Sequence, residues 1–351
     1  MTSSNKQKKN DTILVFCPNW VGDVVMATPT FECIRQNFPE ARCIGLIRRY
    51  VRGVVEDGPW FDDLIEINDK TIGGIFKLVS HLRRLKPDLS LVLPNSFRSA
   101  LIARLGGVRR IYGYRRNGRS AIITGGPQPW RNNNHITPRP MVEYYMEICR
   151  WLNFNPPVQL KPQLYCSAST VERGARLIKS YGIAPGDLVI GMNPGAKFGS
   201  SKCWPPEYFA RLAEMISKKW DCKIMLFIGP GEQNLGHQIV NLSRTKIINT
   251  GPDNVSLELL KPMIQRCQLL ITNDTGPRHY AVSFDVPVVV IMGPTDPRYT
   301  NANLEKTIVL RRDIDCVPCH DKECALHHSC MTEIIPEAAL QAAEKLLLEH
   351  C

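Results

Sequence analysis

Short apolar runs alternate with segments of helical periodicity along almost the whole chain. A buried parallel strand is a continuous apolar run, whereas the helix that follows it is apolar on one face only. The alternation therefore predicts βαβ units and parallel sheets. In the first half we expect helices at Val24–Asn37 and Met141–Leu152, and strands at Thr12–Cys17, Cys43–Ile47, Leu64–Ile67 and Leu89–Leu93.

A proline-bearing stretch, Asn153–Pro162, interrupts this pattern, which then starts again. A chain of 351 residues is also longer than a single core usually holds. We therefore expect two doubly wound α/β domains, residues 11–160 and 161–335, followed by an amphipathic helix within residues 336–351. The helices expected in the second domain are Val171–Tyr181, Glu207–Trp220, Leu257–Gln265 and Arg278–Phe284, and the strands are Leu188–Met192, Lys223–Ile228, Leu269–Thr272 and Val286–Met292.

The charge balance narrows the choice of partner. The sequence has 44 Lys and Arg residues against 33 Asp and Glu residues, which gives a formal net charge of +11. This balance favours nucleic acid, a phosphorylated substrate or an acidic membrane surface, although many soluble proteins are mildly basic. The sequence has no helix-turn-helix and no RNA-binding aromatic signature, so we expect no nucleic-acid partner.

No apolar run reaches the roughly 20 residues that a membrane-spanning helix needs. Residues 1–10 are polar and lysine-rich, and they lack the apolar core of a secretory signal. We expect them to form a disordered basic arm on a cytoplasmic protein.

The loops directly after strands carry the candidate chemistry, because doubly wound domains bind ligands at the carboxyl ends of their strands. The first such loop is Pro18–Asp23. Gly22 lets the backbone approach a ligand, and Asp23 stands where the next helix starts. The loop is not the G-x-G-x-x-G fingerprint, which argues against a nicotinamide or flavin enzyme. Asp23 fits either a catalytic carboxylate or a helix N-cap.

Four further loops follow strands of the second half. Asn193–Lys197 has the small residues and lysine that suit a diphosphate, but it lacks the ending of a Walker A loop. Gly229–Glu232 offers a carboxylate for ribose hydroxyls, or is a plain turn. Asn273–Pro277 opens a helix whose N-terminus can bind an anion, with His279 either beside the ligand or in the core. Gly293–Pro297 has no catalytic candidate.

Together these loops resemble glycosyltransferase family 9, the ADP-heptose lipopolysaccharide heptosyltransferases. The resemblance runs from about Ile13 to Pro297, and the pieces N-W-V-G-D and P-N-S-F resemble the members that add the second heptose. Pro277-Arg278 departs from the apolar pair usual in the family. The matching stretches, in the family's order, are ILVFCPNWVGDVVMATP, LVLPNSFRSAL, MNPGAKFGSSKCWPPEYFARLAE and TNDTGPRHYAVSFDVPVVVIMGPTDP.

The resemblance implies a GT-B fold, in which two Rossmann-like doubly wound domains face a central cleft, with the acceptor on the first and the donor on the second. It implies an inverting transfer of L-glycero-D-manno-heptose from ADP-heptose, without a catalytic metal or a cofactor. The implied acceptor is the first heptose of the lipopolysaccharide inner core, linked to Kdo2–lipid A, and the implied place of action is the cytoplasmic face of the inner membrane.

By motif, the resemblance makes Asp23 the general base, and it assigns Lys202 to the donor diphosphate or sugar and Glu232 to the ribose. The other donor-binding residues that it implies are Gly195, Ala196, Asp274, Thr275, Gly276 and His279. A basic face is expected for the acceptor, because guanidinium groups bind Kdo carboxylates and lipid A phosphates, although a solvated arginine loop is the alternative. The candidates for this face are Asn95, Arg98, Arg116 and Arg119.

Two other functions stay open. One is a family 9 heptosyltransferase with a different acceptor. The other is a GT-B-like nucleotide-sugar epimerase, which would convert its donor without any acceptor.

The cysteines raise a separate question. Cys316, Cys319, Cys324 and Cys330 form the pattern C-x2-C-x4-C-x5-C. The first pair has the spacing of a structural zinc site, and four thiolates would complete a tetrahedral one, but the second pair does not have this spacing. A structural metal and unliganded thiols are both compatible with the pattern.

Overall fold

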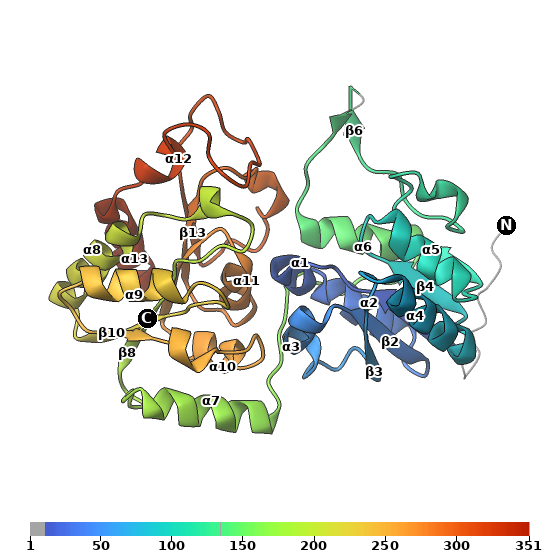
Figure 1. Ribbon diagram of the computed structural model, residues 1–351, viewed down its shortest axis with the longest axis horizontal. Coiled ribbons are helices and arrows are strands. Elements are labelled where there is room, and N and C mark those ends of the chain that lie inside the picture. The colour runs from blue at the N-terminus through green and yellow to red at the C-terminus, as the bar shows by residue number, and fades with distance from the viewer. Residues whose placement is uncertain (1–10, 134, 351) are drawn as a thin grey trace. The chain divides into compact units, whose positions relative to one another are not determined.

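The computed structural model describes residues 11–133 and 135–350, so the expected basic arm at residues 1–10 lies outside the described residues. The chain divides into two compact units, Met1–Pro162 and Gln163–Cys351. Each unit is an α/β domain built on one main parallel sheet, as Figure 1 shows. The α/β class and the parallel sheets predicted from the alternating pattern are confirmed.

The first domain has a five-stranded parallel sheet with the strand order β3-β2-β1-β4-β5. β1 is central, because Ile13 lies opposite Cys43 of β2 on one side and opposite Leu89 of β4 on the other. A short antiparallel hairpin, β6 and β7, lies outside this sheet. The strands are β1 (Thr12–Phe16), β2 (Arg42–Ile47), β3 (Asp63–Glu66), β4 (Leu89–Val92), β5 (Arg110–Tyr112), β6 (Arg131–Asn132) and β7 (His135–Ile136).

One predicted helix of the first domain is wrong, because Val24–Asn37 is two helices that meet at Ala27. Pro29 has no N–H to donate to the carbonyl of Val25, and the Thr28 hydroxyl donates to that carbonyl at 2.8 Å instead. The helices of this domain are α1 (Val21–Met26), α2 (Thr28–Asn37), α3 (Arg52–Val55), α4 (Ile72–Leu85), α5 (Phe97–Leu105) and α6 (Met141–Trp151).

The second domain has a six-stranded parallel sheet with the strand order β10-β9-β8-β11-β12-β13. Ile190 of β8 lies between Ile224 of β9 and Leu269 of β11. The strands are β8 (Leu188–Asn193), β9 (Cys222–Leu226), β10 (Ile247–Asn249), β11 (Leu269–Asn273), β12 (Val288–Met292) and β13 (Thr307–Arg311). The helices are α7 (Ala168–Ser180), α8 (Pro206–Lys219), α9 (Gln233–Leu242), α10 (Leu260–Gln265), α11 (Gly276–Ser283), α12 (Ser329–Thr332) and α13 (Pro336–His350).

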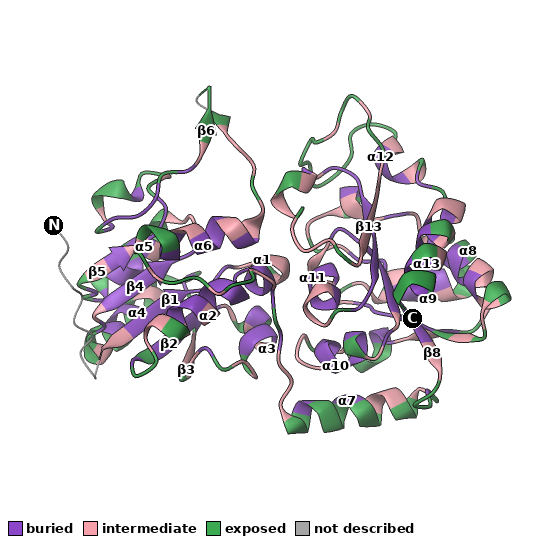
Figure 2. Cartoon of the chain, turned by 180° about the vertical axis from the view of Figure 1, so that it is seen from behind, coloured by how far each residue is buried: buried purple, intermediate pink, exposed green. Residues whose placement is uncertain are grey.

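Each domain buries its own core between sheet and helices, and Figure 2 shows the buried residues concentrated there. In the first domain Phe16 of β1 shares a cluster with Leu82 of α4 and Ile102 of α5. In the second, Ile271 of β11 shares a cluster with Phe209 of α8. These cores fix the strand ends from which the functional loops project.

Both sheets reverse their strand order beside their first strand, between β1 and β4 and between β8 and β11. At such a switch point the loops after the two central strands run to opposite faces of the sheet and leave a crevice where ligands bind. The loop after β1 leads into α1, whose first turn contains Asp23, and the loop after β4 begins at Leu93. In the second domain, the loop after β8 leads to Lys202, and Asp274 follows β11 directly.

Candidate active site

Asp23 lies in the first turn of α1, just beyond the carboxyl end of β1. The N-cap of α1 is Trp20, so the alternative role of Asp23 as an N-cap is wrong. The side chain of Asp23 is half-buried, and the Tyr145 hydroxyl of α6 donates to its Oδ1 at 3.2 Å. Burial raises the pKa of Tyr145, and the nearby Asp23 carboxylate raises it further, so Tyr145 stays protonated and orients the carboxylate.

Three other aspartates of the first domain lie at the opposite edge of the sheet, where the strands begin. Asp62 accepts the backbone N–H of Cys43 at 2.7 Å, near the start of β2. Asp63 is the first residue of β3, and Asp88 accepts the backbone N–H of Thr12 at 3.1 Å. These carboxylates hold strand ends in place, and they are a full strand length from the edge that carries Asp23.

Asn95, just after β4, is held by side chains from two later segments. Its Oδ1 accepts a hydrogen bond from the Tyr144 hydroxyl at 3.0 Å and one from Arg119 Nη2 at 3.3 Å. Asn117 Nδ2 donates to the Asn95 carbonyl at 2.7 Å. Arg116 Nη1 donates to the Tyr144 hydroxyl at 3.4 Å. The structure thus brings together three of the four predicted acceptor residues, Asn95, Arg116 and Arg119.

The positions of Arg119 and Arg98 do not fit a single exposed basic face. Arg119 is completely buried, with its Nε donating to the Tyr114 carbonyl at 2.7 Å, and burial lowers its pKa to about 10. Arg98 is exposed and lies at a different place, where its Nη1 donates to the Asp69 carbonyl at 3.1 Å. Asp69 itself pairs with Arg48 at 2.6 Å. Arg119 therefore holds the Asn95 side chain from the buried interior of the domain. The guanidinium of Arg98 stays exposed to solvent.

In the second domain, two asparagines tie together the loops that follow β8 and β11. Asn193 Nδ2 donates to the Thr275 hydroxyl at 3.1 Å, across the switch point. Asn273 Nδ2 donates in the other direction, to the Pro194 carbonyl at 2.6 Å. Both asparagines are buried, so these bonds hold the two loops in one fixed arrangement.

Lys202 and Asp274, predicted separately as donor-binding residues, are in direct contact. Lys202 Nζ donates to Asp274 Oδ2 at 2.9 Å and to the Asp274 carbonyl at 2.9 Å. Since an ammonium has three N–H donors, one is left for a ligand oxygen. The contact also brings a residue of the β8 loop against the start of the β11 loop.

Asp274 has a second cationic partner that the sequence analysis missed. Arg278 Nη1 pairs with Asp274 Oδ1 at 2.7 Å, and the Thr295 hydroxyl donates to Oδ2 at 2.6 Å. Burial opposes ionisation of Asp274, but Arg278 and Lys202 outweigh it and hold the pKa of the carboxyl well below its usual range. The group formed by Lys202, Asp274 and Arg278 therefore carries a formal charge of +1.

Arg278 is the residue at which the sequence departs from the family pattern, and its place in the structure explains the departure. Its side chain is almost fully buried, and it also donates to the Thr300 hydroxyl at 3.2 Å. It lies on the buried side of Asp274, and it affects the site by keeping that carboxylate ionised and in place. Local sequence gave no signal for this role, because an arginine in a helical turn is usually solvated.

His279 is buried in the first turns of α11. Burial and the Arg278 charge lower the pKa of His279 to about 3, so its imidazole is neutral at physiological pH. A neutral imidazole can hydrogen-bond a ligand but does not add a charge at the diphosphate.

The start of α11 is the expected anion site of this domain. Thr275 is its N-cap and Gly276 its first residue, and the Thr275 side chain makes no cap hydrogen bond to the helix. The N-terminal N–H groups and the helix dipole offer partial positive charge next to Asp274 and Lys202.

Glu232 and Gly195 meet although they follow different strands. Glu232 Oε2 accepts the backbone N–H of Gly229 at 2.9 Å. A Cβ on Gly195 would lie 1.9 Å from Glu232 Oε2, so only glycine leaves room for the carboxylate. Ala196, the next residue, is half-buried beside them. The loops of β8 and β9 thus form one continuous surface.

The cysteine-bearing segment between β13 and α12 packs against the loop of Lys202. Ser201 donates its backbone N–H to the Lys322 carbonyl at 3.1 Å, and the Ser201 carbonyl lies 2.8 Å from His328 Nε2. These contacts make the segment a support for the loop that carries Lys202.

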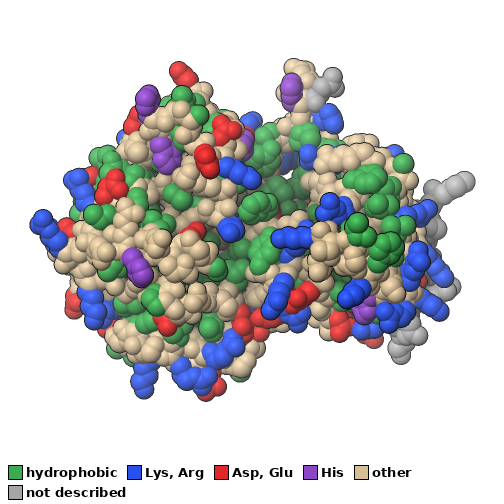
Figure 3. Space-filling view, viewed as in Figure 1, with side chains coloured by type: hydrophobic (Ala, Val, Ile, Leu, Met, Phe, Trp, Pro, Cys, Tyr) green, Lys and Arg blue, Asp and Glu red, His purple; other side chains and the backbone are tan. Residues whose placement is uncertain are grey.

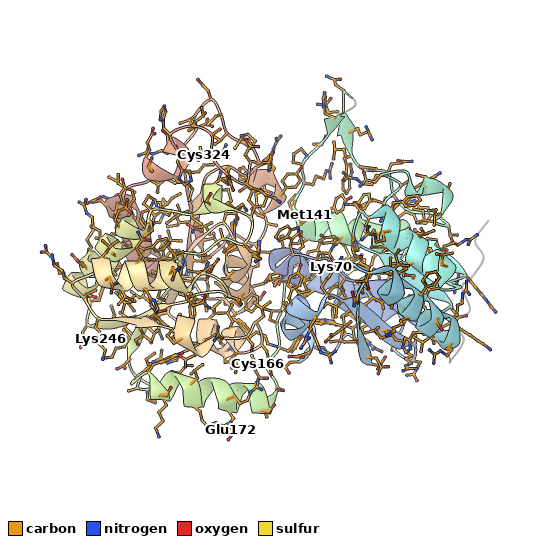
Figure 4. All side chains as sticks on the ribbon, in the orientation of Figure 1. Lys70, Met141, Cys166, Glu172, Lys246 and Cys324 are labelled. Atoms are coloured by element: carbon orange, nitrogen blue, oxygen red, sulfur yellow. The ribbon has the colours of Figure 1, made fainter. Side chains whose placement is uncertain are left out.

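The four cysteines of this segment lie at different depths. Cys316, Cys319 and Cys324 are exposed, with Cys324 labelled in Figure 4, and Cys330 is buried. Burial raises the pKa of Cys330 to about 11, and the other three thiols add to the rise. Within the described ranges, no group of three or more His, Cys, Asp or Glu side chains is arranged to hold a metal ion.

Comparison with known proteins identifies the class. The model of glycosyltransferase family 9 (heptosyltransferase) matches residues 75–329. Lipooligosaccharide heptosyltransferase 2 of Campylobacter jejuni is 27% identical over 342 residues, which cover 95% of this chain and 98% of the relative. The chain belongs to glycosyltransferase family 9 and is a glycosyltransferase, which confirms the predicted family and enzyme class.

Two solved structures extend the similarity to the fold. The Escherichia coli ADP-heptose lipopolysaccharide heptosyltransferase II aligns with a TM-score of 0.80 and 25% identity, over 96% of this chain and 99% of that one. A family 9 glycosyl transferase from Veillonella parvula aligns with a TM-score of 0.83 and 25% identity, over 99% and 100%. The predicted pair of Rossmann-like domains is confirmed. In the part of the chain that the structure describes, no helix is long and apolar enough to span a membrane.

Proposed function

We propose that the chain transfers L-glycero-D-manno-heptose from ADP-heptose to the first heptose of the lipopolysaccharide inner core, with inversion at the anomeric carbon. The observation that carries the proposal is the group formed by Lys202, Asp274 and Arg278 at the start of α11. It unites a net positive charge with a helix N-terminus at the switch point of the second domain. A nucleoside diphosphate is the leaving group that such a site stabilises.

The donor is held by the loops of the second domain. Lys202 donates its remaining N–H to the diphosphate, and the backbone N–H groups of Thr275 and Gly276 face the same charge. Glu232 accepts the ribose hydroxyls, a common role for a carboxylate at the end of the second strand of such a sheet. Gly195 and Ala196 let the ligand approach the backbone, and His279 contributes a neutral imidazole.

Asp23 is the general base. The acceptor hydroxyl must lose its proton as it attacks the anomeric carbon, and a positioned carboxylate can take that proton. The hydrogen bond from the Tyr145 hydroxyl to Oδ1 orients this carboxylate. The negative charge that grows on the diphosphate in the same step is offset by Lys202 and the start of α11.

The acceptor is held around Asn95. Arg116 and the exposed Arg98 bind its anionic groups, and Arg119 fixes Asn95 from the buried side. Because this acceptor is anchored to lipid A, we place the enzyme in the cytoplasm, peripheral to the inner membrane.

The rival activity is nucleotide-sugar epimerisation, and the fate of the donor separates the two. The purified chain is incubated with ADP-heptose with and without a heptose-bearing acceptor, and ADP and free sugar are followed by chromatography. The proposal predicts ADP release that depends on acceptor. Conversion of the donor at the same rate without acceptor would contradict it.

A further inference from the structure

Two neighbouring helices of the first domain expose large hydrophobic side chains. Of the fourteen such side chains that are exposed in the described residues, five lie on α4 and α5. On α5, Phe97, Leu101 and Leu105 recur every four residues and therefore form one stripe. On α4, Ile72 and Phe76 are 76% and 70% exposed.

These side chains lie on the faces of α4 and α5 that point away from the core. The core is filled from α4 by Leu78, Val79 and Leu82 and from α5 by residues such as Ile102, all of them buried. Helix α5 is thus apolar on two opposite faces, and the second of these faces is uncovered in the domain. An exposed apolar patch of this kind marks an interaction surface.

Helices α4 and α5 lie side by side, with their starts together and their ends together. At their ends, Arg83 Nε of α4 donates to the Leu105 carbonyl of α5 at 2.8 Å. Near their starts, Arg98 of α5 bonds to Asp69, which comes shortly before α4. Figure 3 shows hydrophobic side chains gathered over these helices with Lys and Arg side chains at the margins. We call this surface the α4–α5 face: Ile72, Phe76, Phe97, Leu101 and Leu105 with their flanking cations.

The charge around the α4–α5 face is predominantly positive, and the nearby Asp69 is paired with Arg48. Residues 70–110 contain nine Lys and Arg residues and one acidic residue, Asp88. That aspartate is engaged with Thr12 at the opposite edge of the sheet. Lys77 and Arg104 are exposed beside the hydrophobic stripe, and Lys70, labelled in Figure 4, comes just before α4.

We propose that the α4–α5 face docks on an anionic lipid bilayer. Apolar side chains that enter the acyl boundary, ringed by cations that meet phosphate headgroups, are the combination that holds a peripheral protein on such a surface. A second protein would need a matching acidic surface, whereas a bilayer supplies negative charge everywhere. The inference rests on the proposed function in one respect, because a lipid-anchored acceptor lies at such a surface.

The position of the face fits this role. Phe97 is two residues beyond Asn95, so the stripe begins at the same edge of the sheet as Asn95 and Asp23. A bilayer against α5 presents the sugar of an anchored acceptor to the edge that carries the base.

The test uses the full chain and sedimentation with vesicles of phosphatidylcholine, with or without phosphatidylglycerol. The variant is Ile72→Ser/Phe76→Ser/Leu101→Ser. The matched control is Val171→Ser/Leu242→Ser/Leu348→Ser, at three exposed hydrophobic positions of the second domain. We expect the wild type to bind the phosphatidylglycerol vesicles, high salt to weaken binding, and the α4–α5 variant to bind at least about tenfold more weakly. The control should bind like the wild type.

Two further readouts make the result decisive. Turnover with a water-soluble, deacylated acceptor should be unchanged in the α4–α5 variant, which shows that the proposed function and the docking surface are independent. Equal vesicle binding by the variant and the wild type would overturn the inference. So would a change from dimer to monomer in the variant during analytical ultracentrifugation without a change in vesicle binding, because the face would then join two copies of the chain.

Discussion

At the scale of single residues, the strongest prediction concerns Asp23 as the proposed general base. Asp23→Asn keeps the shape of the side chain and a hydrogen-bond partner for Tyr145 but removes the basic oxygen. We expect kcat to fall by about 10²-fold or more, the usual worth of general-base assistance, with ADP affinity unchanged. Steady-state kinetics and calorimetric ADP binding measure the two quantities. The matched control is Asp63→Asn, at the other edge of the sheet. A fall in kcat of similar size in this control would contradict the assignment of Asp23 as the base.

Lys202 is expected to act on the transition state. Lys202→Ala removes the cation that we propose faces the leaving diphosphate, and it should cost about 2–4 kcal/mol in kcat/KM. Lys197→Ala, at an exposed position of the same loop, serves as the control and should stay within about twofold of the wild type. A loss of less than threefold for Lys202→Ala would exclude the role.

Arg278 should matter for stability. Arg278→Ala leaves Asp274 buried with one cationic partner instead of two, and removing one partner of a buried ion pair costs about 3–5 kcal/mol. Arg176→Ala, which breaks the exposed pair with Glu172, should cost less than about 1 kcal/mol. Urea unfolding compares the two. Equal stabilities would mean that Asp274 gains nothing from Arg278.

The sequence predicted candidate residues for the site, but not how they pair with one another. Asp23, Lys202 and Asp274 lie between a strand and the body of the next helix, and this position can be predicted from the pattern of apolar runs. The hydrogen bond between Tyr145 and Asp23 joins residues 122 positions apart, so it cannot be predicted from the local sequence around either residue. Arg119 was predicted to belong to the basic acceptor face, with a solvated loop as the alternative, yet it is buried and donates to the carbonyls of Tyr114 and Pro94.

At the scale of elements, the close approach of the β8 and β9 loops gives a direct prediction. Gly195→Ala would place a Cβ where the Glu232 carboxylate lies, and that flexible end can move without unfolding the domain. We expect ADP affinity to fall by about tenfold or more, with the unfolding transition nearly unchanged. Gly186→Ala is the control, because a Cβ there meets nothing within 4 Å. Unchanged ADP affinity in Gly195→Ala would remove Glu232 from the donor site.

Several elements that the sequence missed have weak patterns of hydrophobic residues, for two different reasons. β5, β10 and β13 are short or only partly buried, so their apolar runs do not stand out. α5 has hydrophobic residues on its outer face as well as its core face, which erases the contrast on which helical periodicity depends. The same outer residues form the α4–α5 face.

At the scale of the whole molecule, the chain matches its relatives from end to end. The similarity to the Campylobacter jejuni enzyme covers 95% of this chain and 98% of that enzyme, and so includes both domains of this chain. Both domains have the same arrangement of switch-point loops. In the proposed mechanism the first domain carries the base and the second stabilises the leaving group. A transfer reaction requires both, whereas conversion of a donor alone would not need the cluster around Asn95.

The central claim is transfer of heptose to an inner-core heptose, and the mass of the acceptor tests it most directly. The chain is incubated with ADP-heptose and with two lipopolysaccharide acceptors, one carrying a single heptose on Kdo2–lipid A and one carrying no heptose. Mass spectrometry should show a gain of one heptose residue on the first acceptor and none on the second. A gain on the heptose-free acceptor, or no gain on either while ADP is released, would contradict the account.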